Sequence, residues 1–151
     1  QLDAILQYIT DTWRSVTGLQ KPNIALTHCT EKTSEKFPIT LSYQDVKAYA
    51  DEGRYGDVNI DGPMDVKTAC DAESGAIKGI ASPVVGNADI IIFPDIEAGN
   101  TFYKAITFFA SATVAGMLAG TTVPVVVTSR ADSADSKFYS LATACLKAIN
   151  K

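Results

Sequence analysis

The sequence has little of several residue types that mark particular protein classes. It contains one histidine and three cysteines in 151 residues. The cysteines Cys29, Cys70 and Cys145 are odd in number, widely spaced and absent from any C-x-x-C pair. A disulfide framework and a structural zinc site are therefore disfavoured, and no metal is expected. A reducing compartment suits such a chain, so we expect a cytoplasmic location.

Positive charge and long apolar runs are also scarce. The 13 basic and 17 acidic side chains give a net charge of −4. A mildly acidic chain has no broad attraction for nucleic acid or anionic membrane, so neither is expected as a partner. No apolar run reaches the roughly 18 residues of a membrane span. The start Gln1-Leu2-Asp3 lacks an initiator Met and the charged segment of a signal peptide, which indicates a piece of a longer chain.

The spacing of the apolar residues switches repeatedly between helical and strand-like patterns. This alternation predicts an α/β fold, with a mostly parallel sheet covered by helices on both faces, in one domain over residues 1–151. The segment 88–93 (ADIIIF) is predicted as a central strand because it is apolar on both faces. The other predicted strands are 23–28, 57–60, 113–118 and 123–128. The predicted helices are Leu2 to about Gly18, 42–51, 63–73, 99–110 and a last helix capped by Asp132 or Ser133.

Polar segments follow three of the predicted strands, and ligands of open α/β sheets collect at such strand ends. The first segment is Asp61-Gly62-Pro63, the second is 94–100 (PDIEAGN) and the third is 128–133 (TSRADS). If the strands are parallel, all three lie at the same edge of the sheet. In the first segment, Asp61 can equally cap the helix that we expect to begin at Pro63.

Helical geometry places the polar residues after the second segment on one face. At 100° per residue, Asn100, Lys104 and Thr107 fall within about 60° of one another. The opposite, apolar face is expected to pack on the core through Phe102, Ala105, Ile106 and Phe109. Asn100 is also expected near the helix N-terminus, where free N–H groups favour an anion. The alternative is a solvated helix face with a capping Asn.

The third segment places Ser129 and Arg130 just past an apolar strand. The arginine fork suits a phosphate or a developing oxyanion, and Asp132 or Asp135 can orient it or accept a proton. The alternative is that Asp132 caps the last helix while Arg130 forms a surface ion pair. Along that helix we expect an inward face formed by Phe138, Leu141, Ala142, Cys145 and Ile149.

The single histidine, His28, lies beside Cys29, but a Cys–His nucleophile is disfavoured because adjacent strand residues point to opposite faces. The phosphate-binding patterns G-x-x-x-x-G-K-[ST] and G-x-G-x-x-G are absent. The sequence therefore offers no nucleotide-binding or zinc motif.

Three segments together resemble the phosphate acetyl- and butyryltransferase family. They are 61–69 (DGPMDVKTA), 86–105 (GNADIIIFPDIEAGNTFYKA) and 123–133 (VPVVVTSRADS), in the order and at the spacing of that family. The resemblance implies an isocitrate/isopropylmalate-dehydrogenase-like domain, the C-terminal half of a two-domain acyltransferase whose N-terminal half is absent. It also implies a homodimer or a higher homo-oligomer.

The reaction that the resemblance implies converts acyl-CoA and phosphate into acyl phosphate and CoA, with coenzyme A as a substrate and no cofactor. The resemblance gives Arg130 the phosphate or acyl-phosphate oxygens and Ser129 the tetrahedral intermediate. The family's base is missing from its expected position, so the nearby Asp132 is taken as the third catalytic candidate, with Asp135 as a further substitute. It places Asn100 and Lys104 on the phosphate side. The further candidates for substrate binding are Asp61, Thr128 and Ser133.

The chain departs from the acetyl-specific pattern at two positions. Ala131 stands where that pattern has Gly, and Ser136 stands where we expect the Asp that deprotonates the CoA thiol. The SRADS form is more similar to the butyryl branch. Two alternatives stay open: a metal- and NAD-dependent dehydrogenase of the related fold, and a non-catalytic regulatory or partner-binding domain. The 151 residues alone are expected to be inactive.

Overall fold

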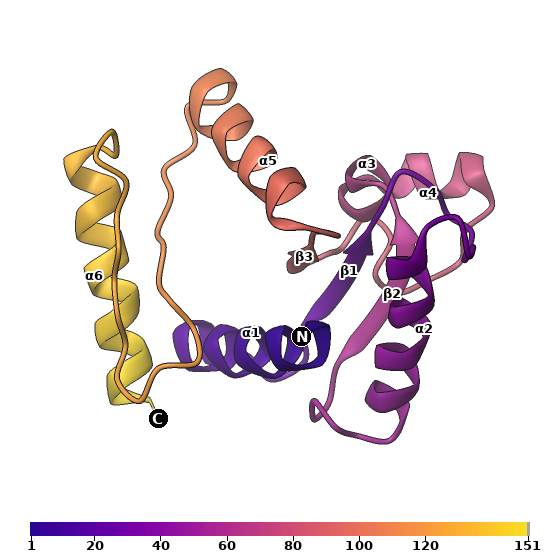
Figure 1. The fold of residues 1–151 in the computed structure, drawn as a ribbon, viewed down its shortest axis with the longest axis horizontal. Helices are drawn as coiled ribbons and strands as arrows, with labels where there is room; N and C mark the ends of the chain where they lie inside the picture. The colour runs from indigo at the N-terminus through magenta and orange to yellow at the C-terminus, as the bar shows by residue number, and fades with distance from the viewer. Residues whose placement is uncertain (151) are drawn as a thin grey trace. The chain divides into compact units, whose positions relative to one another are not determined.

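The computed structural model describes residues 1–150 and divides them into two compact units. The sheet unit comprises Gln20–Asn100, and the terminal unit comprises Asp3–Leu19 with residues 101–150. The elements, labelled in Figure 1, are α1 (Leu2–Thr17), β1 (Asn23–Thr27), α2 (Pro38–Asp51), β2 (Asn59–Met64), α3 (Val66–Cys70), α4 (Ala72–Lys78), β3 (Ile90–Ile92), α5 (Ile96–Phe109) and α6 (Ala134–Ile149).

The sheet unit is built on three parallel strands in the order β2-β1-β3. Side chains alternate between faces along a strand, so Ile24 and Leu26 point away from the face that Ala25 occupies. All three are fully buried, so β1 is covered on both faces, as a central parallel strand requires. The parallel α/β fold is confirmed. The 88–93 segment forms only β3, at an edge of the described sheet, and the central position belongs to β1.

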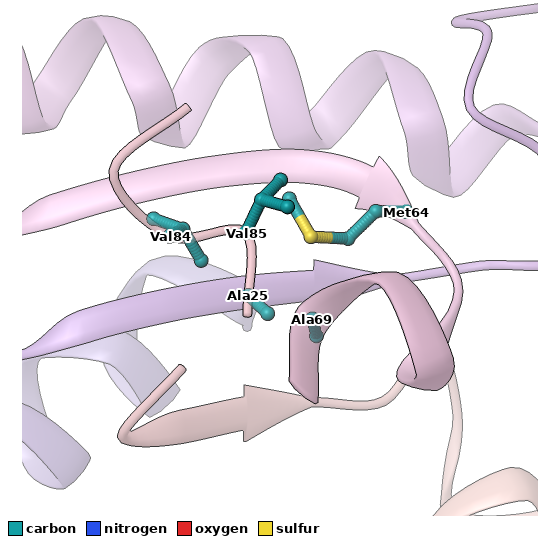
Figure 2. Close-up of a cluster of buried hydrophobic side chains, with 5 residues drawn as sticks. All are labelled: Ala25, Met64, Ala69, Val84 and Val85. Carbon is teal, nitrogen blue, oxygen red and sulfur yellow. The ribbon is translucent and has the colours of Figure 1, made fainter. Parts of the chain in front are cut away.

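The core of the sheet unit lies where β1, β2 and α3 meet (Figure 2). Its buried members are Ala25, Met64, Ala69, Val84 and Val85. Ile80 and Ala88 pack against this cluster. Tyr43, on α2, is also fully buried, and its hydroxyl donates to the carbonyl oxygen of Thr27 at 2.8 Å. The helix is thereby joined to the carboxyl end of β1.

The segment Asp61-Gly62-Pro63 lies inside β2, so its prediction as a turn that opens a helix is wrong. The register of β1 and β2 shifts between Ala25 and Thr27, and the chain comes very close to β1 there. A Cβ on Gly62 would lie 2.3 Å from the carbonyl oxygen of Leu26, and the φ of Gly62 is +148°. Only glycine suits such an approach, and a glycine inside a strand often marks one.

The helices that follow β2 are two short ones, α3 and α4, instead of the single predicted helix 63–73. The side chain of Asp65 accepts from the backbone N–H of Thr68 and caps α3. Asp71 ends α3 and caps α4 by accepting from the N–H of Glu73. Extended backbone at Asp71 therefore breaks the helical run in two.

The terminal unit contains α1 and α6. Side-chain contacts join these two helices. Lys147 forms an ion pair with Asp11, and the side-chain amide of Asn150 donates to the carbonyl oxygen of Ser15 at 2.8 Å. The predicted first helix is confirmed, including its end at Gly18, whose φ of +73° is the left-handed conformation of a helix C-cap. The predicted cap of the last helix is confirmed as Ser133.

The predicted strands 113–118 and 123–128 are wrong. Between α5 and α6 the chain has no regular secondary structure (Figure 1), apart from an isolated bridge between Leu118 and Val125. A strand needs the hydrogen bonds of a neighbouring strand, and within residues 101–150 no other strand is present. Apolar sequence alone therefore does not produce a sheet here.

The predicted inward faces of the last two helices are also wrong in part. Within the described residues α5 has no fully buried side chain, and Phe109 is 83% exposed. On α6, Phe138, Leu141 and Ile149 are exposed, whereas Ser136 and Ser140 are buried. Both helices thus present apolar side chains that the described residues leave uncovered.

No helix within residues 1–150 combines the length and the apolar character needed to cross a membrane.

Candidate functional site

The candidate site residues fall in both units. Asp61 and Asn100 belong to the sheet unit. Lys104 and the segment 128–133 belong to the terminal unit. The predicted gathering of Asn100 with Arg130 around one ligand stays a prediction.

In the sheet unit, Asp61 is half-buried and bound by its neighbours. Its carboxylate accepts from the Lys47 ammonium at 2.6 Å and from the Gly62 N–H at 2.8 Å. Burial by itself raises the pKa of Asp61, but hydrogen bonds from Lys47, Ser82 and Gly62 outweigh it and lower the pKa below its usual value. Asp61 is therefore ionised at neutral pH.

Lys47 and Asp61 line an open hollow of about 240 Å³ at the end of β2. The other residues that line it are Glu31, Thr33, Gln44, Gly62, Pro63, Met64 and Ile80. The hollow is slightly smaller than the roughly 300 Å³ at which small-molecule pockets begin. The charge of Lys47 is already balanced by Asp61, so this hollow alone is a weak attractor for a polyanion.

Helix α5 begins at Ile96, three residues earlier than predicted, and Asp95 supports its first turn. The carboxylate of Asp95 accepts from the N–H of Ala98 at 2.7 Å. Asn100 is therefore the fifth helical residue, past the free N–H groups of the first turn. The expectation that Asn100 lies at the anion-favouring helix end is wrong. Asn100 and Lys104 are both exposed and lie one turn apart on this helix.

In the terminal unit, residues 129–132 form a turn closed by two hydrogen bonds. The backbone N–H of Asp132 donates to the carbonyl oxygen of Ser129 at 3.1 Å. The backbone N–H of Ser129 donates in return to the carboxylate of Asp132 at 2.7 Å. Arg130 and Ala131 form the exposed tip, so the guanidinium stands on a turn whose ends are fixed.

The residues that flank this turn have distinct surroundings. Thr128 is half-buried, and Ser133 is exposed at the start of α6. The Ser133 hydroxyl accepts from the N–H of Ser136 at 3.1 Å as the cap of that helix. Asp132 accepts a further hydrogen bond, at 2.8 Å, from the hydroxyl of Tyr103 on α5. The turn is thus tied to the helix that also bears Lys104.

Hydrogen bonding sets the protonation of this pair. The hydrogen bond from Tyr103, and then that from the Ser129 N–H, lower the pKa of Asp132, with smaller contributions from Lys104 and Lys137. The same bond to Asp132 raises the pKa of Tyr103. At neutral pH the pair is therefore a phenol donating to a carboxylate.

Sequence reasoning missed Tyr103 and Lys47 as partners of the candidate residues. Tyr103 had one usable signal, since it lies three residues after Asn100 and directly before Lys104 on the predicted helix. Lys47 had none, because its contact with Asp61 depends on how α2 packs against β2.

The geometric argument against a pair of His28 and Cys29 is wrong. Strand β1 ends at Thr27, so the alternation of faces does not extend to these residues. The Cys29 Sγ lies 3.6 Å from the His28 Nδ1, and the imidazole packs edge-on against Phe37 with the ring centroids 4.7 Å apart. All three cysteines are free and exposed.

Comparison with known proteins identifies the family. Residues 1–145 match the family model described as phosphate acetyl/butaryl transferase. The phosphate acetyltransferase of Thermotoga maritima is 43% identical over 128 residues, covering 85% of this chain and 44% of that protein. The phosphate butyryltransferase of Clostridium acetobutylicum is 38% identical over 134 residues, covering 89% of this chain and 44% of that protein.

A solved structure agrees with these matches. The branched-chain phosphotransacylase of Enterococcus faecalis V583 superimposes with a TM-score of 0.84 at 36% identity, covering 97% of this chain and 53% of that chain. The chain thus spans about half the length of the relatives it matches. On these matches, and with the resembling segments at 61–69, 86–105 and 123–133, the chain belongs to the phosphate acetyl/butyryltransferase family of transferases.

Proposed function

We propose that the complete protein transfers a short acyl group, acetyl or butyryl, between coenzyme A and inorganic phosphate to give an acyl phosphate. The observation that supports this most directly is the Ser129–Asp132 turn, which presents an exposed arginine from a hydrogen-bonded base. The family match over residues 1–145 supports the same reaction.

The proposed chemistry needs no covalent acyl-enzyme. A phosphate oxygen attacks the thioester carbonyl, the tetrahedral intermediate collapses, and the CoA thiolate leaves and takes up a proton. The protein must align the two reactants and stabilise the oxyanion. In this scheme Arg130 binds phosphate or acyl-phosphate oxygens and Ser129 donates to the intermediate, while Asp132 lies beside them in the same turn. The proposed substrate contacts are those of Asn100, Lys104, Asp61, Thr128 and Ser133.

The larger architecture belongs to the same proposal. We place this chain as the C-terminal half of a two-domain, isocitrate/isopropylmalate-dehydrogenase-like acyltransferase with its site in the cleft between the domains. The relatives are about twice as long, which supports this placement. Coenzyme A is a substrate and no further cofactor is proposed. We also propose that the complete protein is cytoplasmic and forms a homodimer or a higher homo-oligomer. The 151-residue chain alone is expected to be inactive, because half of the cleft is missing.

Butyryl is the preferred acyl group in this proposal. The support is the SRADS sequence at 129–133, since acetyl-specific members usually have Gly after the arginine. The relatives do not decide between the two, because acetyl- and butyryltransferases match at similar identity. The ratio of kcat/KM for butyryl-CoA to that for acetyl-CoA tests this preference, and a ratio below one contradicts it.

The assay for the main proposal follows free thiol. The complete protein, supplied with butyryl-CoA or acetyl-CoA and phosphate, should release CoA thiol and form the acyl phosphate in equal amounts. No thiol release with any short acyl-CoA would defeat the proposal. Metal-dependent reduction of NAD with a small hydroxy acid would favour the dehydrogenase alternative, which the family match does not support.

A further inference from the structure

Asp132 connects three parts of the terminal unit. Its backbone N–H and its carboxylate both bind Ser129, which closes the turn. The second carboxylate oxygen accepts from the Tyr103 hydroxyl at 2.8 Å. The chain of contacts therefore runs from Tyr103 on α5, through Asp132, to the backbone of the residue that precedes Arg130.

Tyr103 is itself held in place on α5. It is half-buried, and the ammonium of Lys104 lies 4.3 Å from the centroid of its ring. The carbonyl oxygen of Tyr103 accepts from the Thr107 hydroxyl at 2.9 Å. A side chain on a regular helix can fix the position of a turn better than the irregular segment between α5 and α6 can.

The contacts of Asp132 suit an orienting group better than a base. Both carboxylate oxygens already accept a hydrogen bond. An ordinary thiol has a pKa of roughly 8.5, far above that of a carboxylate. The lowered pKa of Asp132 widens this gap, which makes proton transfer from the CoA thiol to Asp132 less favourable. Hydrogen bonds to a charged acceptor are also the stronger kind, so the carboxylate holds the turn firmly.

We propose that Tyr103 and Asp132 are positioning residues for the acyl-transfer reaction, holding the Ser129–Arg130 turn in its productive orientation, and that Tyr103 acts only through Asp132. This inference rests on the proposed function. The misplacement of a catalytic group by about 1 Å can cost on the order of a hundredfold in rate, so the fixation of this turn is worth a large factor.

The decisive variants are Asp132→Ala, Asp132→Asn and Tyr103→Phe in the complete protein, assayed by thiol release from butyryl-CoA and phosphate. An Asn at 132 can accept from the Ser129 N–H with its oxygen and donate its amide hydrogen to the Tyr103 oxygen, but it cannot take a proton. We expect Asp132→Ala to lower kcat about a hundredfold and Asp132→Asn to lower it less than about tenfold. The KM for butyryl-CoA should stay within about threefold in both.

Tyr103→Phe should lower kcat by about tenfold, which corresponds to the loss of one hydrogen bond to a charged group. Adding Tyr103→Phe to Asp132→Ala should cause no further loss, because residues that act in series are not additive. The matched control is Tyr139→Phe, an exposed tyrosine on α6, which should stay within about twofold of wild type. The unfolding free energy of each variant, measured in parallel, corrects the rates for the folded fraction.

Each outcome is decisive. Asp132→Asn as inactive as Asp132→Ala, at equal stability, overturns positioning in favour of a role in proton transfer to the departing CoA thiolate. An unchanged rate in Tyr103→Phe, or full additivity in the double variant, removes Tyr103 from the account while the proposed function stands. A wild-type protein that releases no thiol defeats the proposed function itself, and this inference with it.

Discussion

The sheet unit and the terminal unit differ in how they treat apolar residues. The sheet unit buries most of the hydrophobic side chains that are buried in the described residues, among them Ile24, Leu26, Met64 and Ile92. In the terminal unit Leu6 is the one buried hydrophobic side chain within the described residues. Its exposed apolar residues include Phe108, Phe109, Val123, Val127, Phe138, Leu141 and Ile149.

The comparison indicates that the two units have different roles, one in stability and one in the proposed active site. The sheet unit contains a parallel sheet and a closed core, so it supplies stability to this chain. The terminal unit contains the Ser129–Arg130 turn but leaves many of its large apolar side chains exposed. Exposed apolar side chains in such number are unusual for a finished surface, and the relatives are about twice as long as this chain. The terminal unit is therefore expected to depend on further chain for its packing.

The largest stability effect is expected at Gly62. In Gly62→Ala the new Cβ would meet the Leu26 backbone at 2.3 Å, and the φ of +148° is strained for alanine. Together these should cost about 4 kcal/mol of unfolding free energy, measured by urea denaturation. Gly53→Ala is the control, since its φ is +80° but nothing lies within 4 Å of a new Cβ. It should cost about 1 kcal/mol; equal losses in the two variants contradict the close approach.

The next effect contrasts one apolar side chain from each unit. Leu26→Ala empties a fully buried position in β1 and should cost about 3 kcal/mol. Phe138→Ala removes an exposed ring on α6 and should change the stability of the 151-residue chain by less than about 0.5 kcal/mol. In the complete protein the Phe138 effect should rise above about 1 kcal/mol. A Phe138 effect that stays small there contradicts the expectation that further chain covers this side chain.

The smallest effect concerns the pH dependence of the sheet unit. Hydrogen bonds from Lys78 and from the Thr68 N–H lower the pKa of Asp65 from 3.8 to about 2. A lowered carboxylate pKa stabilises the fold above about pH 4, and this contribution is lost as the pH falls towards 2. The side chain of Asp65 is 39% exposed, so Asp65→Ala should cost only about 1 kcal/mol at pH 7. The difference from wild type should shrink by pH 2.5; a constant difference contradicts this account.

Local signals predicted much of the sheet unit. Residues 24–26 are apolar and follow Pro22 and Asn23, so β1 followed from sequence. In the terminal unit α1 was predictable in the same way, with its end at Gly18. The Asp61-Gly62-Pro63 segment misled because a strand containing Gly and Pro depends on the close approach of β1, which no local pattern reveals. Strands 113–118 and 123–128 failed for a related reason, since strand formation requires a pairing partner.

The candidate site was predictable in its residues but not in its contacts. The arginine after an apolar run and the polar face of the earlier helix 99–110 are visible in sequence. The bond between Tyr103 and Asp132 joins residues 29 positions apart and depends on tertiary structure. The capping role of Ser133 was predictable because Ser, Asp and Thr favour that position.

The assignment of the active site to the terminal unit is tested most directly by replacing one arginine in each unit. In the complete protein, Arg130→Ala should lower kcat for acyl transfer by about a hundredfold or more, as for loss of an oxyanion donor, with unfolding free energy unchanged. Arg54→Ala, which removes a side chain stacked on Tyr49 in the sheet unit, should leave kcat within about threefold. An Arg130→Ala protein with wild-type turnover would contradict the central claim that this turn belongs to the active site.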